Sequence, residues 1–89
     1  MIEAKIEVIN KLGLHARAAA KLVGVANQFS SNILLDKAGK TANAKSIMTV
    51  MMLGAAKGTI LDVSAEGKDE QAAIDAIKTI FNNYFDEGE

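Results

Sequence analysis

The only histidine of the chain, His15, stands two residues before Arg17. A neutral imidazole is a nucleophile, and a guanidinium group can bind two oxygens of a phosphoryl group at once. Lys21 follows Arg17 by four residues, so in a helix it adds positive charge on the same side. These residue types at this spacing favour phosphoryl chemistry at His15, with Arg17 holding the transferred group.

The residues around His15 predict a strand before it and a helix after it. Apolar and charged side chains alternate over residues 2–9, and Asn10 and Gly13 then interrupt the pattern. Residues 16–28 are rich in strong helix formers. The apolar positions at helical spacing are Ala19, Leu22, Val23 and Ala26. We therefore expect His15 at the N-terminal cap of this helix.

A helix start of this kind would suit a phosphoryl group on His15. The first backbone N–H groups of a helix have no partner within it, and the positive end of the helix dipole lies beside them. The N–H groups of Ala16 and Arg17 are therefore expected to hold phosphoryl oxygens. The same field disfavours imidazolium, by roughly 0.3–1 kcal/mol at an exposed helix end, and so favours the neutral nucleophile.

Two other interpretations of His15 remain open from the residues alone. A lone histidine beside a loop is often a solvated surface residue without a chemical task. A metal ligand is less favoured, because the chain has no cysteine and no second histidine at ligand spacing. The chain also has no glycine-rich loop for a cofactor phosphate, so we expect neither a metal nor a cofactor.

Three blocks of the chain resemble HPr, the phosphocarrier family of the bacterial phosphotransferase system. In order, the blocks are residues 13–17 (Gly-Leu-His-Ala-Arg) with 21–22, residues 45–48 (Lys-Ser-Ile-Met) with 53–54 and 56–58, and residues 81–87. The last block is similar to the ending of the family's nitrogen-branch members. The family usually has proline after the arginine. Ala18 stands there in this chain and gives up rigidity in the first helical turn.

The resemblance implies an α+β fold, an open-faced sandwich in the order βαββαβα, in which three helices cover one side of a four-stranded antiparallel sheet. Residues 1–89 would form one such domain. It also implies that Nδ1 of His15 accepts a phosphoryl group from enzyme I charged by phosphoenolpyruvate, and passes it to a histidine of an enzyme II A component. The protein would then be a covalent carrier in sugar uptake or nitrogen-linked regulation, and a substrate of enzymes rather than an enzyme.

Ser46 precedes an apolar segment, residues 47–53, that is predicted to form a short helix. Its hydroxyl is expected to cap this helix by accepting a hydrogen bond from an N–H group of the first turn. The resemblance implies a second role for Ser46, as a regulatory phosphorylation site in bacteria that possess an HPr kinase/phosphorylase. That kinase would be a further partner.

The segment 47–53 is apolar on nearly every side, so we expect part of it to face a partner. Val50 and Leu53 are assigned to the core. Methionines adapt to different surfaces, and an exposed apolar patch beside an active site usually marks an interface. The side chains expected to contact partners are Ile47, Met48, Met51 and Lys21.

The remaining segments predict an antiparallel sheet that helices cover on one side. The strand at residues 2–9 would bury only one face. Residues 32–36 and 40–44 predict a hairpin with a glycine in its loop, and residues 59–65 predict a last strand. Asp69 is expected to cap a final helix. The apolar stripe of that helix is Ala73, Ile74, Ile77, Ile80, Phe81 and Tyr84.

The composition of the chain indicates which classes of partner and which cellular compartment to expect. The net charge is −1, and the chain has four aromatic residues and no tryptophan, so neither a basic surface nor stacking platforms for nucleic acid are expected. No stretch reaches the ~18 apolar residues of a membrane span, and no basic start of a signal peptide is present. The absence of cysteine suits a reducing compartment. We expect a cytoplasmic monomer that does not enter the membrane.

Two alternative functions remain open. A small enzyme with a similar layout, such as an acyl phosphatase, would use Arg17 to hold phosphate and would turn over a phosphate ester. A regulatory module of the same fold would act mainly by binding partners, under control at Ser46, without using His15.

Overall fold

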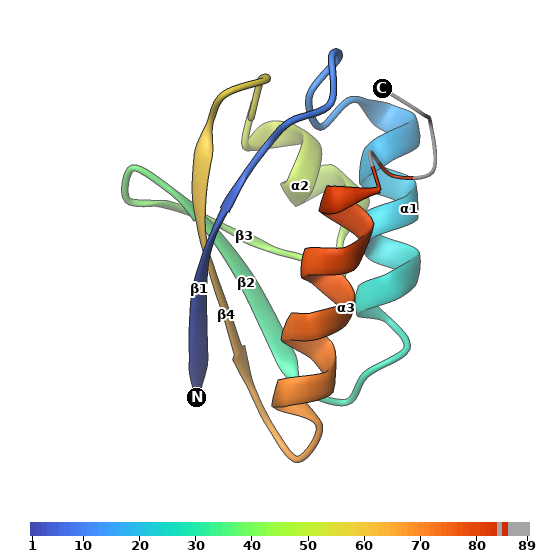
Figure 1. Ribbon diagram of the computed structural model, residues 1–89, viewed down its shortest axis with the longest axis vertical. Coiled ribbons are helices and arrows are strands. Elements are labelled where there is room, and N and C mark those ends of the chain that lie inside the picture. The colour runs from blue at the N-terminus through green and yellow to red at the C-terminus, as the bar shows by residue number, and fades with distance from the viewer. Residues whose placement is uncertain (84, 86–89) are drawn as a thin grey trace.

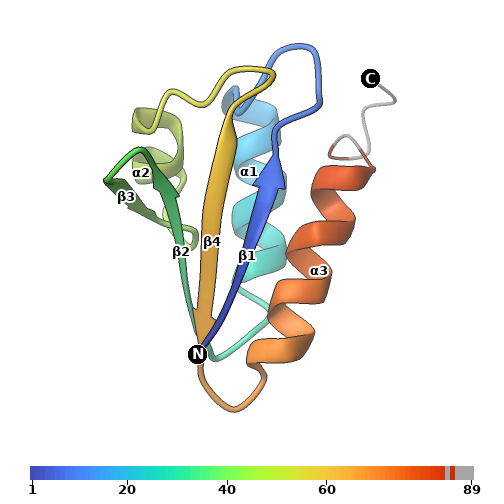
Figure 2. The ribbon, with the colours of Figure 1, turned by 60° about the vertical axis from the view of Figure 1, so that its left-hand side comes forward.

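Within residues 1–83 and 85, which the computed structural model describes, the chain forms four strands and three helices. In chain order these are β1 (Ile2–Glu7), α1 (Ala16–Ala26), β2 (Asn32–Lys37), β3 (Lys40–Asn43), α2 (Ile47–Met52), β4 (Ile60–Glu66) and α3 (Glu70–Asn82). The strands form one sheet in the order β1-β4-β2-β3, and every neighbouring pair is antiparallel. The helices all lie on the same face of this sheet (Figure 1, Figure 2). The expected open-faced sandwich is confirmed.

The alternation of side chains in β1 sets which face of the sheet is covered. Ile6 points into the core and is 7% exposed, whereas Lys5 and Glu7 on either side of it are exposed. The same alternation recurs in β4, where Leu61 and Val63 are fully buried and Asp62 between them is exposed. The outer face, which no helix shields (Figure 2), therefore carries mostly polar side chains, with Leu34 and Ile60 as exposed apolar exceptions.

The hydrophobic core fills the space between the sheet and the helices. Its largest fully buried members include Leu35 from the sheet, Leu22 from α1, and Ile74, Ile77 and Phe81 from α3. The expected stripe of α3 is confirmed for Ala73, Ile74, Ile77, Ile80 and Phe81, and Tyr84 lies outside the described residues. The buried ring of Phe85 packs edge-on against Phe81, with ring centroids 4.8 Å apart. This contact extends the core beyond the end of α3.

Several element bounds differ from the predicted ones by one or two residues. The strand β1 ends at Glu7 rather than at residue 9, although Val8 still donates a hydrogen bond to the Thr59 carbonyl (2.9 Å). The helix α1 ends at Ala26 rather than at residue 28. Gln28 and Phe29 instead donate to carbonyls three residues earlier, the tighter pattern common at helix ends.

The loop between β2 and β3 is a tight hairpin, as predicted. Ala38 and Gly39 both have positive φ angles, 52° and 90°, as a two-residue turn matching the strand twist requires. The carboxylate of Asp36 accepts a hydrogen bond from the Gly39 N–H (2.9 Å). The turn therefore holds Lys37 and Lys40 directly opposite each other at the end of the hairpin.

Asp69 occupies the N-cap position of α3, but its side chain does not cap the helix, so that part of the prediction was wrong. Its carboxylate accepts hydrogen bonds from the N–H groups of Ser30 (2.9 Å) and Ser31 (3.0 Å) and from the Ser31 hydroxyl. These donors lower the pKa of Asp69 to about 2, the Ser31 hydroxyl most strongly and the Ser30 N–H next. Asp69 thus ties the start of α3 to the loop that follows α1.

Candidate functional site

The structure places His15 at the N-cap of α1, as predicted. Its backbone is extended (φ −74°, ψ 178°), and its carbonyl accepts the first helical hydrogen bond from the Ala19 N–H at 2.8 Å. The imidazole is half-buried and makes no capping hydrogen bond. The His15 side chain therefore accepts no hydrogen bond from the first N–H groups of α1, which can bind other acceptors.

The first turn of α1 carries positive charge only. It contains no acidic residue, and its second residue, Arg17, is exposed. Lys21 follows one turn later and is half-buried. One helix end thus brings together His15, the backbone of Ala16 and Arg17, and two cationic side chains, as the sequence predicted. The helix dipole adds to the same positive field.

The loop before His15 packs closely on the segment that follows α2. The Leu14 N–H donates to the Ala55 carbonyl at 2.9 Å, and the Leu14 side chain is 6% exposed. Gly13 has a φ angle of 66°, and a Cβ atom there would lie 2.5 Å from the Ala55 oxygen and 2.9 Å from Cα of Ala56. Only glycine fits this position without a shift of backbone. These contacts fix His15 beside the end of α2.

The helix α2 exposes an apolar patch, which consists of Ile47, Met48, Met51 and Met52 (44, 68, 42 and 63% exposed). The first three were predicted to face partners and Val50 and Leu53 to lie in the core, and the burial of these five residues is as expected. The exposure of Met52 was not predicted. The positions 47, 48, 51 and 52 repeat at helical spacing, and that pattern was the signal that would have found it.

A further exposed apolar residue, Leu12, was also missed. It is 71% exposed in the loop that leads to His15. Its sequence neighbours Asn10, Lys11 and Gly13 mark a loop, and a single large apolar residue in such a loop was the available signal. The patch and Leu12 together give the His15 end of the molecule an apolar surface of the kind that marks interfaces.

Two lysines of the hairpin bind the C-terminal carbonyls of α2. Lys37 Nζ donates to the carbonyl of Gly54 at 3.0 Å, with Leu53 at 3.4 Å, and Lys40 Nζ donates to that of Met52 at 2.9 Å. Cations are favoured at the negative end of a helix dipole. Sequence reasoning found no role for either lysine, because the pairing depends on how the hairpin packs on α2. The two contacts hold α2, and with it the apolar patch, against the sheet.

Ser46 is the N-cap of α2, as predicted. Its Oγ accepts a hydrogen bond from the Thr49 N–H at 3.4 Å, a long contact, and its side chain is half-buried. The Thr49 hydroxyl donates in turn to the carbonyls of Asn43 (2.8 Å) and Ser46 (3.1 Å). Ser46 therefore lies directly beside Ile47, at the edge of the apolar patch.

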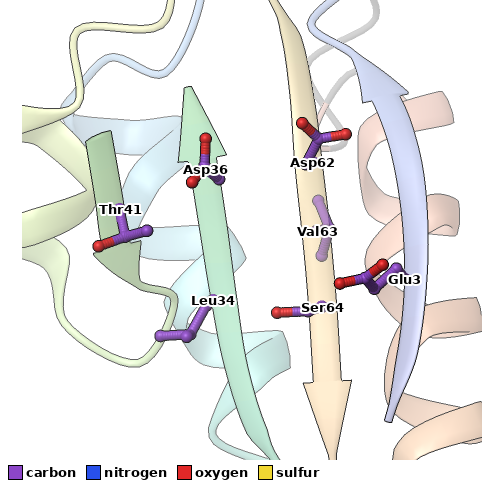
Figure 3. Close-up of a pocket in the computed structure, with 7 residues that line it drawn as sticks. All are labelled: Glu3, Leu34, Asp36, Thr41, Asp62, Val63 and Ser64. Carbon is purple, nitrogen blue, oxygen red and sulfur yellow. The ribbon is translucent and has the colours of Figure 1, made fainter. Parts of the chain in front are cut away.

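A depression of about 440 Å³ lies on the outer face of the sheet, away from the helices (Figure 3). It is lined by Glu3, Leu34, Asp36, Thr41, Asp62, Val63 and Ser64. Asp36 and Asp62 stand opposite each other on neighbouring strands, and Lys5 pairs with Asp62 at 2.7 Å. None of the predicted site residues lines this depression. His15 and its neighbours on α1 therefore lie outside this depression.

Over the part of the chain that the structure describes, no group of three or more metal-binding side chains lies close enough together to hold an ion. No helix within the same part has the length and apolar character needed to cross a membrane.

The fold and the site define a class of protein, an open-faced βαββαβα sandwich with a histidine at the cap of its first helix. The family model described as "PTS HPr component phosphorylation site" matches residues 2–83. The chain therefore belongs to the HPr family, the phosphocarrier proteins of the phosphotransferase system.

Individual relatives are similar over nearly the whole chain. The phosphocarrier protein HPr of Neisseria meningitidis serogroup B is 48% identical over 89 residues, all of both chains. That of Pseudomonas putida is 51% identical over 86 residues, 96% of each chain. The crystal structure of HPr-C-His from Thermoanaerobacter tengcongensis matches with a TM-score of 0.94 and 48% identity over 98% of each chain. The fold and the family expected from the sequence are confirmed.

Proposed function

We propose that Nδ1 of His15 accepts a phosphoryl group from phosphorylated enzyme I and passes it to a histidine of an enzyme II A component. The observation that carries this proposal is the position of His15 at the N-cap of α1, where its imidazole makes no capping hydrogen bond to the helix. Membership in a family of phosphocarriers supports a carrier rather than an acyl phosphatase. The carrier role would serve sugar uptake or nitrogen-linked regulation.

Each transfer exchanges one phosphorus–nitrogen bond for another. Neutral Nδ1 of His15 attacks the phosphorus in line while the bond to the donor imidazole breaks, and the donor nitrogen leaves with the electron pair. No general base is required, since the attacking imidazole arrives neutral. The N–H groups of Ala16 and Arg17 and the Arg17 guanidinium hold the phosphoryl oxygens, whose charge the start of α1 favours.

The apolar patch provides the docking surface for donor and acceptor. Its flexible methionines suit two partners with different surfaces. Ile47, Met48 and Met51 contact both enzymes, and Lys21 adds a positive charge that favours acidic partners. Because both partners use the same surface, they bind in succession, and a monomer meets that requirement.

Ser46 is a regulatory phosphorylation site in this proposal, for an HPr kinase/phosphorylase. Its position beside Ile47 supports this role, because a phosphate there would add about two negative charges at the edge of the patch. The helix start would favour the phosphate electrostatically. A Ser46→Asp variant is then expected to bind enzyme I less tightly than wild type, and equal affinity would count against the regulatory role.

The central test is the intact mass of the protein after incubation with phosphoenolpyruvate and enzyme I of the same organism. Wild type is expected to gain one phosphate that acid removes, and His15→Ala is expected to gain none. If wild type gains no phosphate, His15 is not the carrier, and a regulatory binding module becomes the better explanation.

A further inference from the structure

Asn10 is one of the two buried polar side chains of the described residues, and it is 1% exposed. It lies in the loop between β1 and His15, and it takes no part in the chemistry proposed above. We propose that Asn10 is a positioning residue for phosphoryl transfer at His15. This inference rests on the proposed function.

The Asn10 side chain makes one of two hydrogen bonds that hold the peptide group between Gly13 and Leu14. Its Nδ2 donates to the Gly13 carbonyl at 2.6 Å. The N–H of the same peptide group, that of Leu14, donates to the Ala55 carbonyl at 2.9 Å. A peptide group is planar, so two hydrogen bonds on opposite edges fix its rotation. This fixed peptide group ends at Leu14, the residue directly before His15, so it limits the positions that the His15 backbone can take.

The main chain of Asn10 reinforces the same arrangement. Its carbonyl accepts from the Gly13 N–H at 3.1 Å, which closes a turn around Lys11 and Leu12. Gly13 approaches the backbone of Ala55 so closely that no side chain fits. Hydrogen bonds thus hold the two consecutive peptide groups on either side of Gly13, just before His15.

The Asn10 side chain also carries a cost that argues for a role beyond stability. Its Oδ1 is buried and accepts no hydrogen bond from any described residue. A buried acceptor without a partner lowers stability, and such atoms are uncommon in folded proteins. An apolar side chain would avoid that cost but would leave the Gly13 carbonyl without its donor. The donor is therefore what asparagine contributes at this position.

Ala18, on the helix side of His15, is the reason why the hydrogen bond from Asn10 to the Gly13 carbonyl matters here. Ala18 is fully buried in the first turn of α1 and leaves its φ angle free, whereas proline would fix it. The first helical hydrogen bond begins at the Ala19 N–H, so proline at position 18 would cost no bond within the helix. Because residue 18 is alanine, the backbone at His15 is restrained only from the loop before it, and the Asn10 contact is part of that restraint.

The test measures kcat and KM for phosphorylation by enzyme I, with wild type, Asn10→Ala or Asn10→Asp as the varied substrate. Both variants lose the Nδ2 donor, and kcat is expected to fall about tenfold or more, because small misplacements of a reacting group cost this much. KM is expected to stay unchanged, since the apolar patch is intact. Adding Ala18→Pro to Asn10→Ala is expected to restore part of kcat.

The matched control is Ser31→Ala, which alters the other buried polar residue, in the loop between α1 and β2. It removes a hydrogen bond to Asp69 and lowers stability, but kcat is expected to stay within about twofold of wild type. An equal loss of kcat in Ser31→Ala would reduce Asn10 to a stabilising residue and overturn the proposal.

The remaining outcomes separate the two proposals. If wild type itself is not phosphorylated, the proposed function fails, and with it the basis of this inference. If wild type is phosphorylated and Asn10→Ala keeps the wild-type kcat, only the positioning role fails. A rise in KM alone would also overturn it, because Asn10 would then shape the docking surface. If Asn10→Ala does not fold, Asn10→Ser takes its place. The second measurement is then the rate of hydrogen exchange at the Leu14 N–H. If neither this exchange rate nor kcat changes in Asn10→Ser, the positioning role is overturned.

Discussion

The two long helices begin in opposite electrostatic settings. At the start of α1, the His15 side chain caps no N–H group and the first turn has no acidic residue. At the start of α3, Glu70 stands in the first turn, accepts a hydrogen bond from the Gly67 N–H (3.2 Å) and lies 3.3 Å from the amino terminus of Met1. The Gly67 N–H and then the amino terminus lower the pKa of Glu70. The first turn of α3 thus supplies a carboxylate at the positive end of its helix, whereas the first turn of α1 supplies none.

The starts of α1 and α3 also differ in whether an apolar surface lies beside them. The start of α1 lies beside α2 and its apolar patch, and the start of α3 lies at the opposite end of the molecule (Figure 1). There Asp69 binds the loop at Ser30 and Ser31. We infer that a helix start binds an anion where two conditions hold, namely that its own first turn has no carboxylate and that a partner can approach.

The largest effect is expected from giving α1 the acidic first turn that α3 has. Arg17→Glu removes one donor to the phosphoryl group and adds repulsion, so the rate of phosphorylation by enzyme I should fall on the order of 10²-fold. Initial rates of phosphorylation by enzyme I check this expectation.

The matched control is Lys78→Glu, the same change of charge at an exposed position of α3. Its phosphorylation rate should stay near that of wild type. If both variants lose activity equally, net charge rather than the start of α1 governs the rate.

Met48→Asp tests the second condition, the approach of a partner. Met48 is 68% exposed on α2, so the fold should tolerate the change. A charge in the centre of an apolar interface should raise Kd for enzyme I about tenfold, which corresponds to ~1.4 kcal/mol. Titration calorimetry with enzyme I measures this.

The comparison variant for Met48 is Ile60→Asp, at a 52% exposed apolar residue on the outer face of the sheet. It should bind enzyme I as wild type does. Equal weakening by both variants would show that the docking surface extends beyond the apolar patch.

Local sequence patterns predicted the elements and the residues that begin them. Alternation in β1 and helical spacing in α1 needed only neighbouring residues, and His15 and Ser46 stand at helix caps as expected. Helix starts are set by residues within one turn, which is why this part of the site was accessible from sequence.

Contacts between distant segments could not be predicted in the same way. Lys37 binds the end of α2, Asp69 binds Ser31 rather than its own helix, and Asn10 holds the loop before His15. Each partner is chosen by how elements pack, and nothing in the sequence around these residues specifies it. The sequence therefore predicted the residue proposed for the chemistry but not the contacts around it.

Acid should weaken the contacts at the start of α3. The Ser31 hydroxyl and the Ser30 N–H hold the pKa of Asp69 at about 2, below its ordinary value of 3.8. As pH falls below about 4, the unfolded chain takes up the proton first, so the stabilisation is lost between about pH 4 and pH 2. Denaturant unfolding at pH 5 and pH 2.5 should therefore show a smaller loss of stability in Asp69→Asn than in wild type. The same loss in both would mean that other carboxylates dominate.

The smallest effect concerns the middle of α1, away from its start. Close packing against another helix would be one reason for a glycine there, but a Cβ atom on Gly24 would meet nothing within 4 Å. Gly24→Ala should stabilise the protein by about 0.5–1 kcal/mol, because glycine loses more backbone freedom on folding. The melting temperature should rise by several degrees, and the phosphorylation rate should not change.

At Gly13 the same substitution should lower the melting temperature, since its Cβ atom would meet the Ala55 carbonyl. Opposite changes of the melting temperature at these two glycines would show that the loop before His15 depends on a close approach of two backbone segments, whereas the middle of α1 has room for a side chain.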